Sequence, residues 1–357
     1  MAETKIYTAL GLMSGTSLDG MDAAIIKTDG SSITSFGPFE SKSYEPEFRD
    51  RLRDALGTKQ APDDLEEELT RQHAELVSDL LHKHSLSRSD IDIIGFHGQT
   101  ILHEPENRFT LQIGDGALLS ELTGCAVVNN FRSKDVAAGG EGAPFAPVYH
   151  QALAADYEQA FVIVNIGGVA NVSFVGRDQL LAFDTGPGNA AIDDLVQSRT
   201  GSSYDEDGSL ARRGEVNAEM LAGWLEHRYF DQLPPKSLDR NAFDFAIVET
   251  LSTEDAAATL VAFTVETIAR AATHFPEPAS KWRVTGGGRH NSFMMAELAK
   301  RVEGNVAPVE SEGWNGDAIE AQAFAFMAVR SLLKLPLSFP TTTGVPRPLT
   351  GGDIHSI

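Results

Sequence analysis

The chain has 357 residues, which is too long for one ordinary core and suits two domains. Its composition, 42% hydrophobic and 22% charged, is that of a globular protein, and its net charge of −22 disfavours nucleic acid and anionic membranes as partners. The sequence has one cysteine, no signal-peptide pattern and no apolar run of about 18 residues, so it excludes an intramolecular disulfide and predicts a cytoplasmic protein.

Predicted strands and helices alternate along the first half, which indicates an α/β fold. Residues 5–13 and 21–28 are predicted strands joined by SGTSLDG, a hairpin with a glycine-bearing tip. A helix capped by Asp63 follows, and then a short buried strand, 91–96, that ends in HGQT. Further elements are predicted at 111–113, 117–122 and 126–129. The small-residue segment 130–147 is predicted to cross between domains.

The second half repeats this pattern. A strand at 161–165, the tip IGGVAN and a returning strand at 172–175 precede a strand at 180–183 that runs into DTGPGN. A long helix at 252–275, a strand at 283–285 that opens into GGGRHN, and a last helix near 317–333 complete the chain. A strand–glycine tip–strand unit near the start of each half predicts a duplicated architecture.

Three glycine-bearing segments suit a nucleotide. The tip in GLMSGTSLDGMD can present N–H groups and hydroxyls to phosphate, although an ordinary hairpin turn explains it equally well. Its Asp19 and Asp22 would repel phosphate unless Mg²⁺ lies between them. The second tip, NIGGVAN, makes a two-sided clamp on ATP phosphates plausible. The glycines of VTGGGRHN leave room for adenine and ribose, with a tight strand-to-helix turn as the alternative.

Other polar residues suit catalysis and sugar recognition. Asp184 ends a predicted strand in FDTGPGN, where a carboxylate could act as a general base, although a turn or N-cap aspartate is the alternative. His97 and Gln99 in GFHGQT suit sugar hydroxyls, and a satisfied buried histidine is the alternative for His97. Arg132 in NNFRSKD could pair with a carboxylate.

These segments, in this order and from about Gly11 to about Thr343, resemble the anhydro-N-acetylmuramic acid kinases, bacterial enzymes of peptidoglycan recycling. The resemblance implies a two-lobed, actin-like ATPase fold with ribonuclease H-like duplicated domains, with the nucleotide between the lobes, and a homodimer. It implies lobes at 1–131 and 132–339, with a tail near 340–357 that packs back on the first. The implied reaction converts 1,6-anhydro-N-acetylmuramic acid, ATP and water into N-acetylmuramic acid 6-phosphate and ADP.

The resemblance also assigns residues. Asp184 matches the catalytic base, Arg132 a substrate arginine, and Glu320 an acidic residue of the last helix, with Asp317 as the alternative alignment. Two other functions stay open: a kinase of another 1,6-anhydrosugar such as levoglucosan, and a nucleotide-dependent regulator of the same fold. The complete expectation places ATP at Gly15, Thr16, Ser17, Leu18, Asp19, Gly20, Met21, Asp22, Asn165, Gly167, Gly168, Gly286, Gly287 and Gly288, the sugar at Ser14, His97, Gln99, Arg132, Asn189 and Glu320, and Mg²⁺ at Asp19 and Asp22.

Overall fold

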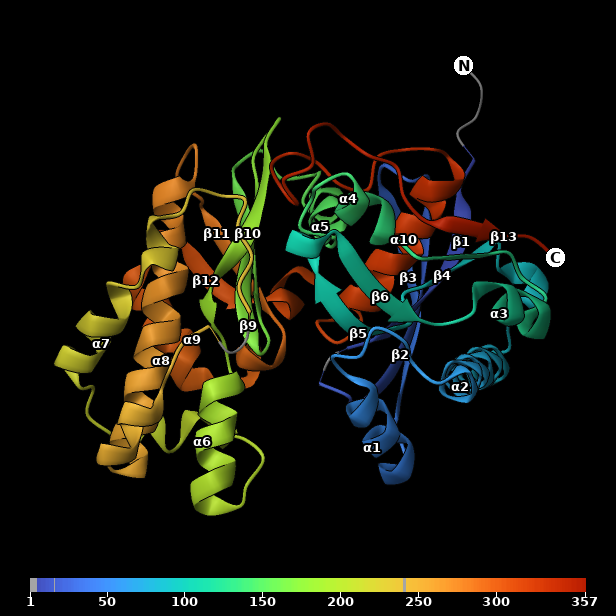
Figure 1. Ribbon diagram of the computed structural model, residues 1–357. Helices are drawn as coiled ribbons and strands as arrows, with labels where there is room; N and C mark the ends of the chain where they lie inside the picture. The colour runs from blue at the N-terminus through green and yellow to red at the C-terminus, as the bar shows by residue number, and fades with distance from the viewer. Residues whose placement is uncertain (1–4, 16, 240–241) are drawn as a thin grey trace. The chain divides into compact units, whose positions relative to one another are not determined.

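The computed structural model describes residues 5–15, 17–239 and 242–357, which form two compact units. Unit 1 combines Met1–Ala155 with Ala318–Ile357, and unit 2 is Asp156–Asp317 (Figure 1). Among the described residues, no helix is both long and apolar enough to cross a membrane.

Unit 1 is built on a six-stranded sheet whose order is β13-β7-β4-β1-β2-β3. The first three strands pair antiparallel in sequence order, whereas β4 runs parallel to β1 and β7 runs parallel to β4. A separate two-stranded ribbon, β5-β6, follows β4. The strands are β1 (Tyr7–Ser14), β2 (Gly20–Thr28), β3 (Ile33–Ser43), β4 (Ile93–Phe96), β5 (Gln99–Glu104), β6 (Phe109–Ile113), β7 (Val127–Asn129) and β13 (Asp353–His355).

The last long helix, α10 (Ile319–Leu332), packs on β1, β2 and β4 of this sheet. Two glycines allow the close approach. A Cβ on Gly11 would lie 1.8 Å from the carbonyl oxygen of Ala321, and one on Gly95 would lie 2.1 Å from that of Phe324. The remaining helices of unit 1 are α1 (Pro46–Ala55), α2 (Asp63–Lys83), α3 (Gly116–Thr123), α4 (Ser133–Ala137) and α5 (Pro147–Leu153).

Unit 2 has a five-stranded sheet of order β10-β9-β8-β11-β12. The helix α8 (Thr253–Arg270) packs on β9 and β10 and contacts the other three helices (Figure 1). It begins as predicted, because the Ser252 hydroxyl accepts a hydrogen bond from the Asp255 amide. The other elements are β8 (Phe161–Ile166), β9 (Val169–Val175), β10 (Leu180–Pro187), β11 (Lys281–Thr285), β12 (Asn305–Pro308), α6 (Ala190–Thr200), α7 (Ala218–Leu225) and α9 (Ser292–Arg301).

The two sheets share one strand order. In each, the first three strands of the unit pair antiparallel, and two later strands, β4 and β7 in unit 1 and β11 and β12 in unit 2, continue parallel to the first on its other side. This is the ribonuclease H-like arrangement, and it confirms the predicted duplicated α/β architecture.

Some details differ from the sequence-based expectation. Arg132–Ala155 groups with unit 1 instead of the second lobe, because α4 contacts β6 and α5 contacts α10. Ala318–Phe339 groups with unit 1 because α10 packs on its sheet. The segment 130–147 therefore lies within unit 1, where it forms α4. The residue Asp63 lies in the first turn of α2, and Pro62 is its N-cap. The strand β10 extends through Pro187, so Asp184 is a strand residue and not part of a turn.

Candidate active site

The first glycine tip joins β1 to β2 in unit 1. The amide of Leu18 donates to the carbonyl of Gly15 at 3.1 Å, and Leu18 adopts a positive φ of 58°. Among the described residues, a Cβ on Gly15 would meet only the Ser17 hydroxyl, at 3.6 Å, so none of them requires glycine there. At Gly20 a Cβ would lie 2.3 Å from the carbonyl oxygen of Lys42 in β3, so this glycine serves sheet packing.

The other residues of this tip that were predicted to contact ATP differ in their exposure to solvent. The side chains of Leu18 and Met21 are buried in the core, so only their main chain could meet a phosphate. Ser17 and Asp19 are exposed, and Asp22 is half-buried in β2. The predicted contact at Thr16 lies outside the described residues.

Arg132 and His97 form a paired site in unit 1. The Arg132 Nε and one terminal nitrogen lie 3.1 and 3.0 Å from His97 Nε2, and the other terminal nitrogen donates to the Gly142 carbonyl at 2.6 Å. Since His97 Nε2 accepts from arginine, Nδ1 carries the proton and donates to the Gly98 carbonyl at 2.7 Å. Both ring nitrogens of His97 are therefore used within the protein, and the ring orients Arg132.

Burial decides the charge of this pair. Removal from water, followed by repulsion from Arg132, lowers the pKa of His97 to about 3, so the ring is neutral. Burial also lowers the pKa of Arg132, to about 10, which still leaves it cationic at neutral pH. Among the described residues, no carboxylate forms an ion pair with this guanidinium, although Glu320 and Asp135 act on it electrostatically at longer range.

Glu320, at the start of α10, joins this group from the far end of the chain. Solvent reaches its side chain, yet the surrounding protein withdraws the carboxyl from bulk water and raises its pKa. The charge of Asp22 raises the pKa further, and the attraction of Arg132 opposes both effects. The structure thus places Glu320 near Asp22 and Arg132. Asp317 lies instead in unit 2, where it pairs with Arg289 at 2.7 Å.

The remaining sugar candidates of unit 1 are buried. The Ser14 hydroxyl donates to the Gly98 carbonyl at 2.9 Å. Gln99 has no exposed surface, and its carbonyl oxygen has no hydrogen-bond partner among the described residues. Sequence reasoning missed Tyr44, a buried side chain near Ser14 and Asp22 whose pKa is raised by burial above all. No motif marks Tyr44, because it lies between β3 and α1 and reaches the site only through the fold.

The second glycine tip, between β8 and β9 in unit 2, is fastened to the turn that follows β10. The amides of Gly188 and Asn189 donate to the carbonyls of Gly168 and Gly167 at 2.9 and 2.7 Å. A Cβ on Gly188 would lie 2.2 Å from the Gly167 oxygen, whereas Cβ atoms on Gly167 and Gly168 would meet nothing closer than 3.6 Å. The tip glycines therefore leave space for a ligand, and Gly188 does not.

Asp184 lies in β10 close to this tip, opposite Asn171 of β9, and the register shifts between Asp184 and Gly186. Its carboxylate accepts a hydrogen bond from the Leu238 amide at 2.8 Å. A bulge at this place re-aims the strand, as is common beside active sites. The arrangement suits a carboxylate held in a fixed orientation beside a bulge in the strand.

A pocket of about 370 Å³ lies between α6 and the start of α9 in unit 2. Gly287, which the sequence predicts as an adenosine contact, lines this pocket. At the neighbouring Gly286 and Gly288, other residues of the protein occupy the place of a Cβ. A Cβ on Gly286 would lie 2.4 Å from the side-chain oxygen of Asn165, and one on Gly288 would lie 2.5 Å from Ile166. The other residues that line this pocket are Asn189, Ile192, Asp193, Tyr204, Asp205, Asp207, His290 and Asn291.

Asn189, predicted as a sugar contact, lines this α6–α9 pocket and donates its amide to the Ile166 carbonyl at 3.0 Å. Tyr204 lines the pocket with a side chain that is 61% exposed, and it was missed because it stands in a polar loop without a motif. An exposed aromatic ring beside a glycine-lined wall suits a flat base.

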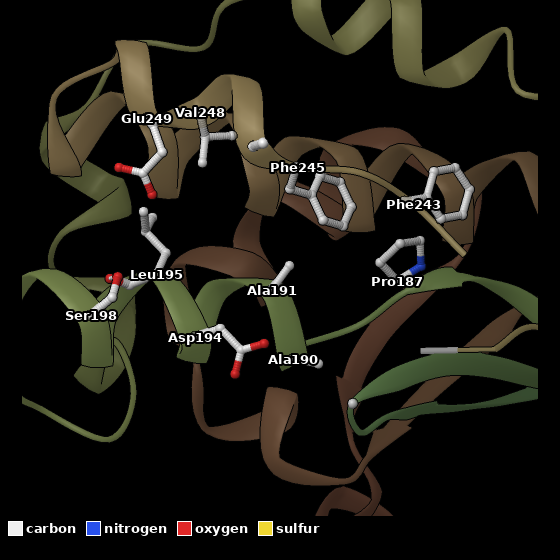
Figure 2. A pocket seen from close by; sticks show the side chains of 12 residues that line it. Pro187, Ala190, Ala191, Asp194, Leu195, Ser198, Phe243, Phe245, Val248 and Glu249 are labelled. Carbon is white, nitrogen blue, oxygen red and sulfur yellow. Dashed lines mark hydrogen bonds between the residues drawn. The ribbon is translucent and has the colours of Figure 1, made fainter. Parts of the chain in front are cut away.

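A second pocket, of about 360 Å³, lies on another face of α6 (Figure 2). Pro187, Phe243 and Phe245 line one end, and Asp194 and Glu249 contribute its carboxylates. Glu249 pairs with Arg199 at 3.2 Å. Gly168 also lines this pocket, and among the described residues that line it, Gly168 is the one that was predicted from the sequence as a ligand contact.

The comparisons with known proteins agree with each other over nearly the whole chain. Residues 7–356 match the family described as Anhydro-N-acetylmuramic acid kinase. A relative of that name from Paramagnetospirillum magneticum is 52% identical, over 97% of this chain and 99% of its own length. Another, from Rhodospirillum rubrum, is 50% identical over 96% and 93%.

Solved structures resemble the chain more distantly. Component A of the (R)-2-hydroxyglutaryl-CoA dehydratase from Acidaminococcus fermentans is 12% identical, with a TM-score of 0.46, over 92% of this chain and 100% of its own. The ROK hexokinase from Thermus thermophilus is also 12% identical, with a TM-score of 0.44, over 91% and 99%.

Proposed function

Because the chain belongs to the anhydro-N-acetylmuramic acid kinase family, we propose that it converts 1,6-anhydro-N-acetylmuramic acid, ATP and water into N-acetylmuramic acid 6-phosphate and ADP. The reaction would serve peptidoglycan recycling. We also propose that the enzyme acts in the cytoplasm as a homodimer; light scattering of the purified protein tests the dimer.

The observation that carries the sugar assignment is Arg132. It is a cation largely withdrawn from water, oriented by His97, with no ion pair to a described carboxylate. A buried charge is costly unless it is compensated. The lactyl carboxylate of a muramic acid supplies that compensation, and an uncharged anhydrosugar such as levoglucosan does not.

The proposed ATP contacts in unit 2 are the second glycine tip and the α6–α9 pocket, and those in unit 1 are at the first glycine tip. Open faces at Gly15, Gly167 and Gly168 leave backbone available to phosphate oxygens. The glycine wall at Gly287 and the exposed ring of Tyr204 suit ribose and adenine. These backbone contacts bind an anion without added cations, which matters in a chain with a net charge of −22.

Asp184 is the proposed general base. Its carboxylate takes a proton from water, and the water oxygen attacks C1 of the sugar. The C1–O6 bond breaks, and O6 accepts the γ-phosphoryl group as ADP leaves. The Leu238 amide fixes one carboxylate oxygen, so the geometry of the base is set before the sugar arrives.

Asp22 and Glu320 fit a divalent cation. The charge of Asp22 raises the pKa of Glu320, so the two carboxylates are close enough to repel each other. Among the described residues no three potential ligands gather, which agrees with Mg²⁺, because it commonly takes one or two carboxylates and otherwise phosphates and water. When bound, it would neutralise phosphate charge. Asp19, exposed beside the tip, stays predicted to hold Mg²⁺ through water and not as a third direct ligand.

A coupled ADP-release assay tests the proposal. The purified protein should release ADP with 1,6-anhydro-N-acetylmuramic acid, and in ¹⁸O-labelled water the product should carry the label at C1. Asp184→Asn should keep ATP affinity and lower kcat by about 10²–10⁴-fold. Asp255→Asn is the matched control, because its carboxylate also accepts a backbone amide, that of Glu215. Normal turnover of Asp184→Asn would overturn the assignment of the base.

The choice of sugar is tested by Arg132→Met. We expect kcat/KM for the muramic substrate to fall about 10–100-fold, as loss of a charge-assisted hydrogen bond predicts, with a smaller effect on levoglucosan. Arg330→Met is the control, since Arg330 is also a buried arginine of unit 1 that bonds to carbonyls, those of Pro336 and Gly30. Equal losses on both sugars would remove the carboxylate role of Arg132.

A further inference from the structure

A single segment of unit 2, Tyr229–Leu238, bonds to Asp184 at three points. The Asp184 amide donates to the Lys236 carbonyl at 3.0 Å, and the Tyr229 hydroxyl donates to the Asp184 carbonyl at 2.5 Å. The Leu238 amide donates to the carboxylate at 2.8 Å. We propose that this segment, the clamp segment, positions Asp184 for proton transfer, with Tyr229 and Lys236 as its positioning residues; the proposal rests on the proposed role of Asp184.

The sheet by itself holds Asp184 weakly. β10 is the edge strand of its sheet, so in the part of the chain that the structure describes one of its sides has no neighbouring strand. On the other side, the register with β9 shifts directly after Asp184. An unpaired edge and a bulge both free the backbone to move. The clamp segment takes the place of the missing strand at this residue, because it bonds to its N–H and its carbonyl.

Tyr229 is itself fixed on both sides. It is 4% exposed, and its amide donates to the His227 ring at 3.3 Å. The rings of Phe230 and Phe243 pack at 5.7 Å, and each contacts Phe263 of α8. The clamp segment is thus anchored to α8. The Tyr229 hydroxyl, at the start of the segment, is therefore held where it can fix the position of Asp184.

Lys236 holds the other half of the segment. It is only 8% exposed, its ammonium donates to the Tyr229 carbonyl at 3.1 Å, and it lies 4.6 Å from the centre of the Tyr229 ring. Burial lowers its pKa, and Asp231 opposes the shift. Burying an ammonium is costly, and an apolar side chain would fill the same space with less penalty. The lysine ties the two ends of the segment together around Asp184.

The chain supplies a matched pair of controls. In the same unit, Lys281 lies 4.4 Å from the centre of the Tyr157 ring, and the Tyr157 hydroxyl donates to Glu312. The variants Tyr157→Phe and Lys281→Met therefore remove the same groups from a similar lysine–tyrosine pair that makes no contact with Asp184. Any cost of losing such a pair in general appears in these controls.

The experiment measures steady-state kinetics in H₂O and D₂O for Tyr229→Phe, Lys236→Met and both controls. Misplacing the base by a fraction of an ångström should lower kcat about 10-fold in Tyr229→Phe, while KM for ATP and sugar changes less than about two-fold. The solvent isotope effect on kcat should increase, because proton transfer becomes more rate-limiting. Lys236→Met should show the same signature to a smaller extent, and the controls should show neither change.

Three results would overturn the inference: unchanged kcat in Tyr229→Phe, a lower kcat with an unchanged isotope effect, or an equal loss in Tyr157→Phe. The parallel variant Asp184→Asn separates this outcome from failure of the proposed function. If Asp184→Asn loses turnover and Tyr229→Phe keeps it, only the clamp is wrong. If Asp184→Asn turns over normally, the base assignment itself is wrong.

Discussion

The two glycine tips look alike in sequence and differ in how they are held. In the tip of unit 1, around Gly15, the described residues form a local hydrogen bond from the Leu18 amide to the Gly15 carbonyl, and the Tyr44 amide donates to the Asp19 carbonyl. The tip of unit 2, at Gly167 and Gly168, is bonded to the residues that follow Asp184. The tip in unit 1 therefore depends on contacts within its own hairpin and with the end of β3, whereas the tip in unit 2 is bonded to the chain that carries the proposed base.

The space available for a Cβ separates the glycines into two groups. Among the described residues, Gly15 and Gly168 have room for a Cβ, so packing gives no reason for glycine at either position and the proposed phosphate contact does. Gly11 and Gly188 have backbone where a Cβ would stand, so the fold is the reason.

The largest expected effect comes from filling the second group. Gly188→Ala would place a Cβ 2.2 Å from the Gly167 oxygen, and Gly11→Ala would place one 1.8 Å from the Ala321 oxygen. Neither contact is with a flexible side chain, so we expect a loss of about 3 kcal/mol or more in the free energy of unfolding. Chemical denaturation measures it. Gly57→Ala shows the cost of strain alone, because its φ is 78° and a Cβ there meets nothing within 4 Å; losses equal to that control would contradict the packing argument.

A second comparison between the units is their response to acid. Burial, as the main cause, lowers the pKa of His73 to about 4, and of His97 and His150 to about 3, and all three belong to unit 1. Unfolding lets each bind a proton below pH 6.5, so stability is present above that pH and is lost as pH falls toward 3. Each should cost about 1 kcal/mol between pH 6.5 and 5.5.

Unit 2 should lose less stability in this pH range, because its His274, whose pKa burial also lowers, is only half-buried. Its Glu312 has a pKa of about 2, because hydrogen bonds from Tyr157, Lys281 and Arg283 outweigh the opposing effect of burial. That contribution is present above the usual glutamate pKa of 4.5 and is lost as pH falls toward 2. Hydrogen exchange at pH 7.5 and 5.5 should therefore show lost protection in the sheet of unit 1 first. Equal loss in both sheets would contradict the prediction, and His73→Leu should make the pH dependence of unit 1 shallower.

A smaller effect is expected from the open glycines. Gly15→Ala and Gly168→Ala should fold with nearly unchanged Tm, since their Cβ atoms meet nothing closer than 3.6 Å. We expect KM for ATP to rise about 10-fold in each, equal to about 1.4 kcal/mol, because a methyl group displaces a phosphate from the backbone. Gly223→Ala, in α7 and with no atom within 4 Å of its Cβ, is the control. Unchanged ATP kinetics would mean that the tips do not meet phosphate.

The smallest effect concerns Glu320. Its pKa is raised, so stability is full below the usual glutamate pKa and declines as pH rises through the raised value. Glu320→Gln should therefore stabilise the protein at pH 7.5 by a few tenths of a kcal/mol, because solvent reaches the group and screens it. At pH 4 the gain should vanish. Thermal unfolding at the two pH values measures it, and a loss of stability at pH 7.5 would show that Glu320 is a net stabilising charge.

The amino-acid sequence by itself determined the two strand–tip–strand units, the alternation of strands and helices, and the placement of Asp184 in the third strand of the second unit. These are local features, because hydrophobic periodicity and glycine-bearing turns are written in neighbouring residues. It could not separate the open glycines from the packed ones, since Gly15 and Gly20 differ only in whether another strand lies beside them.

Only the tertiary structure decided which residues far apart in the sequence lie close together. α10 packs on the first sheet and brings Glu320 near Asp22 and Arg132, so this helix groups with unit 1 and not with the second lobe. The clamp segment reaches Asp184 because the edge of β10 has backbone groups to satisfy, and no motif in Tyr229–Leu238 marks that partnership. Such contacts depend on which surfaces meet after folding, a property of the whole chain that no local pattern contains.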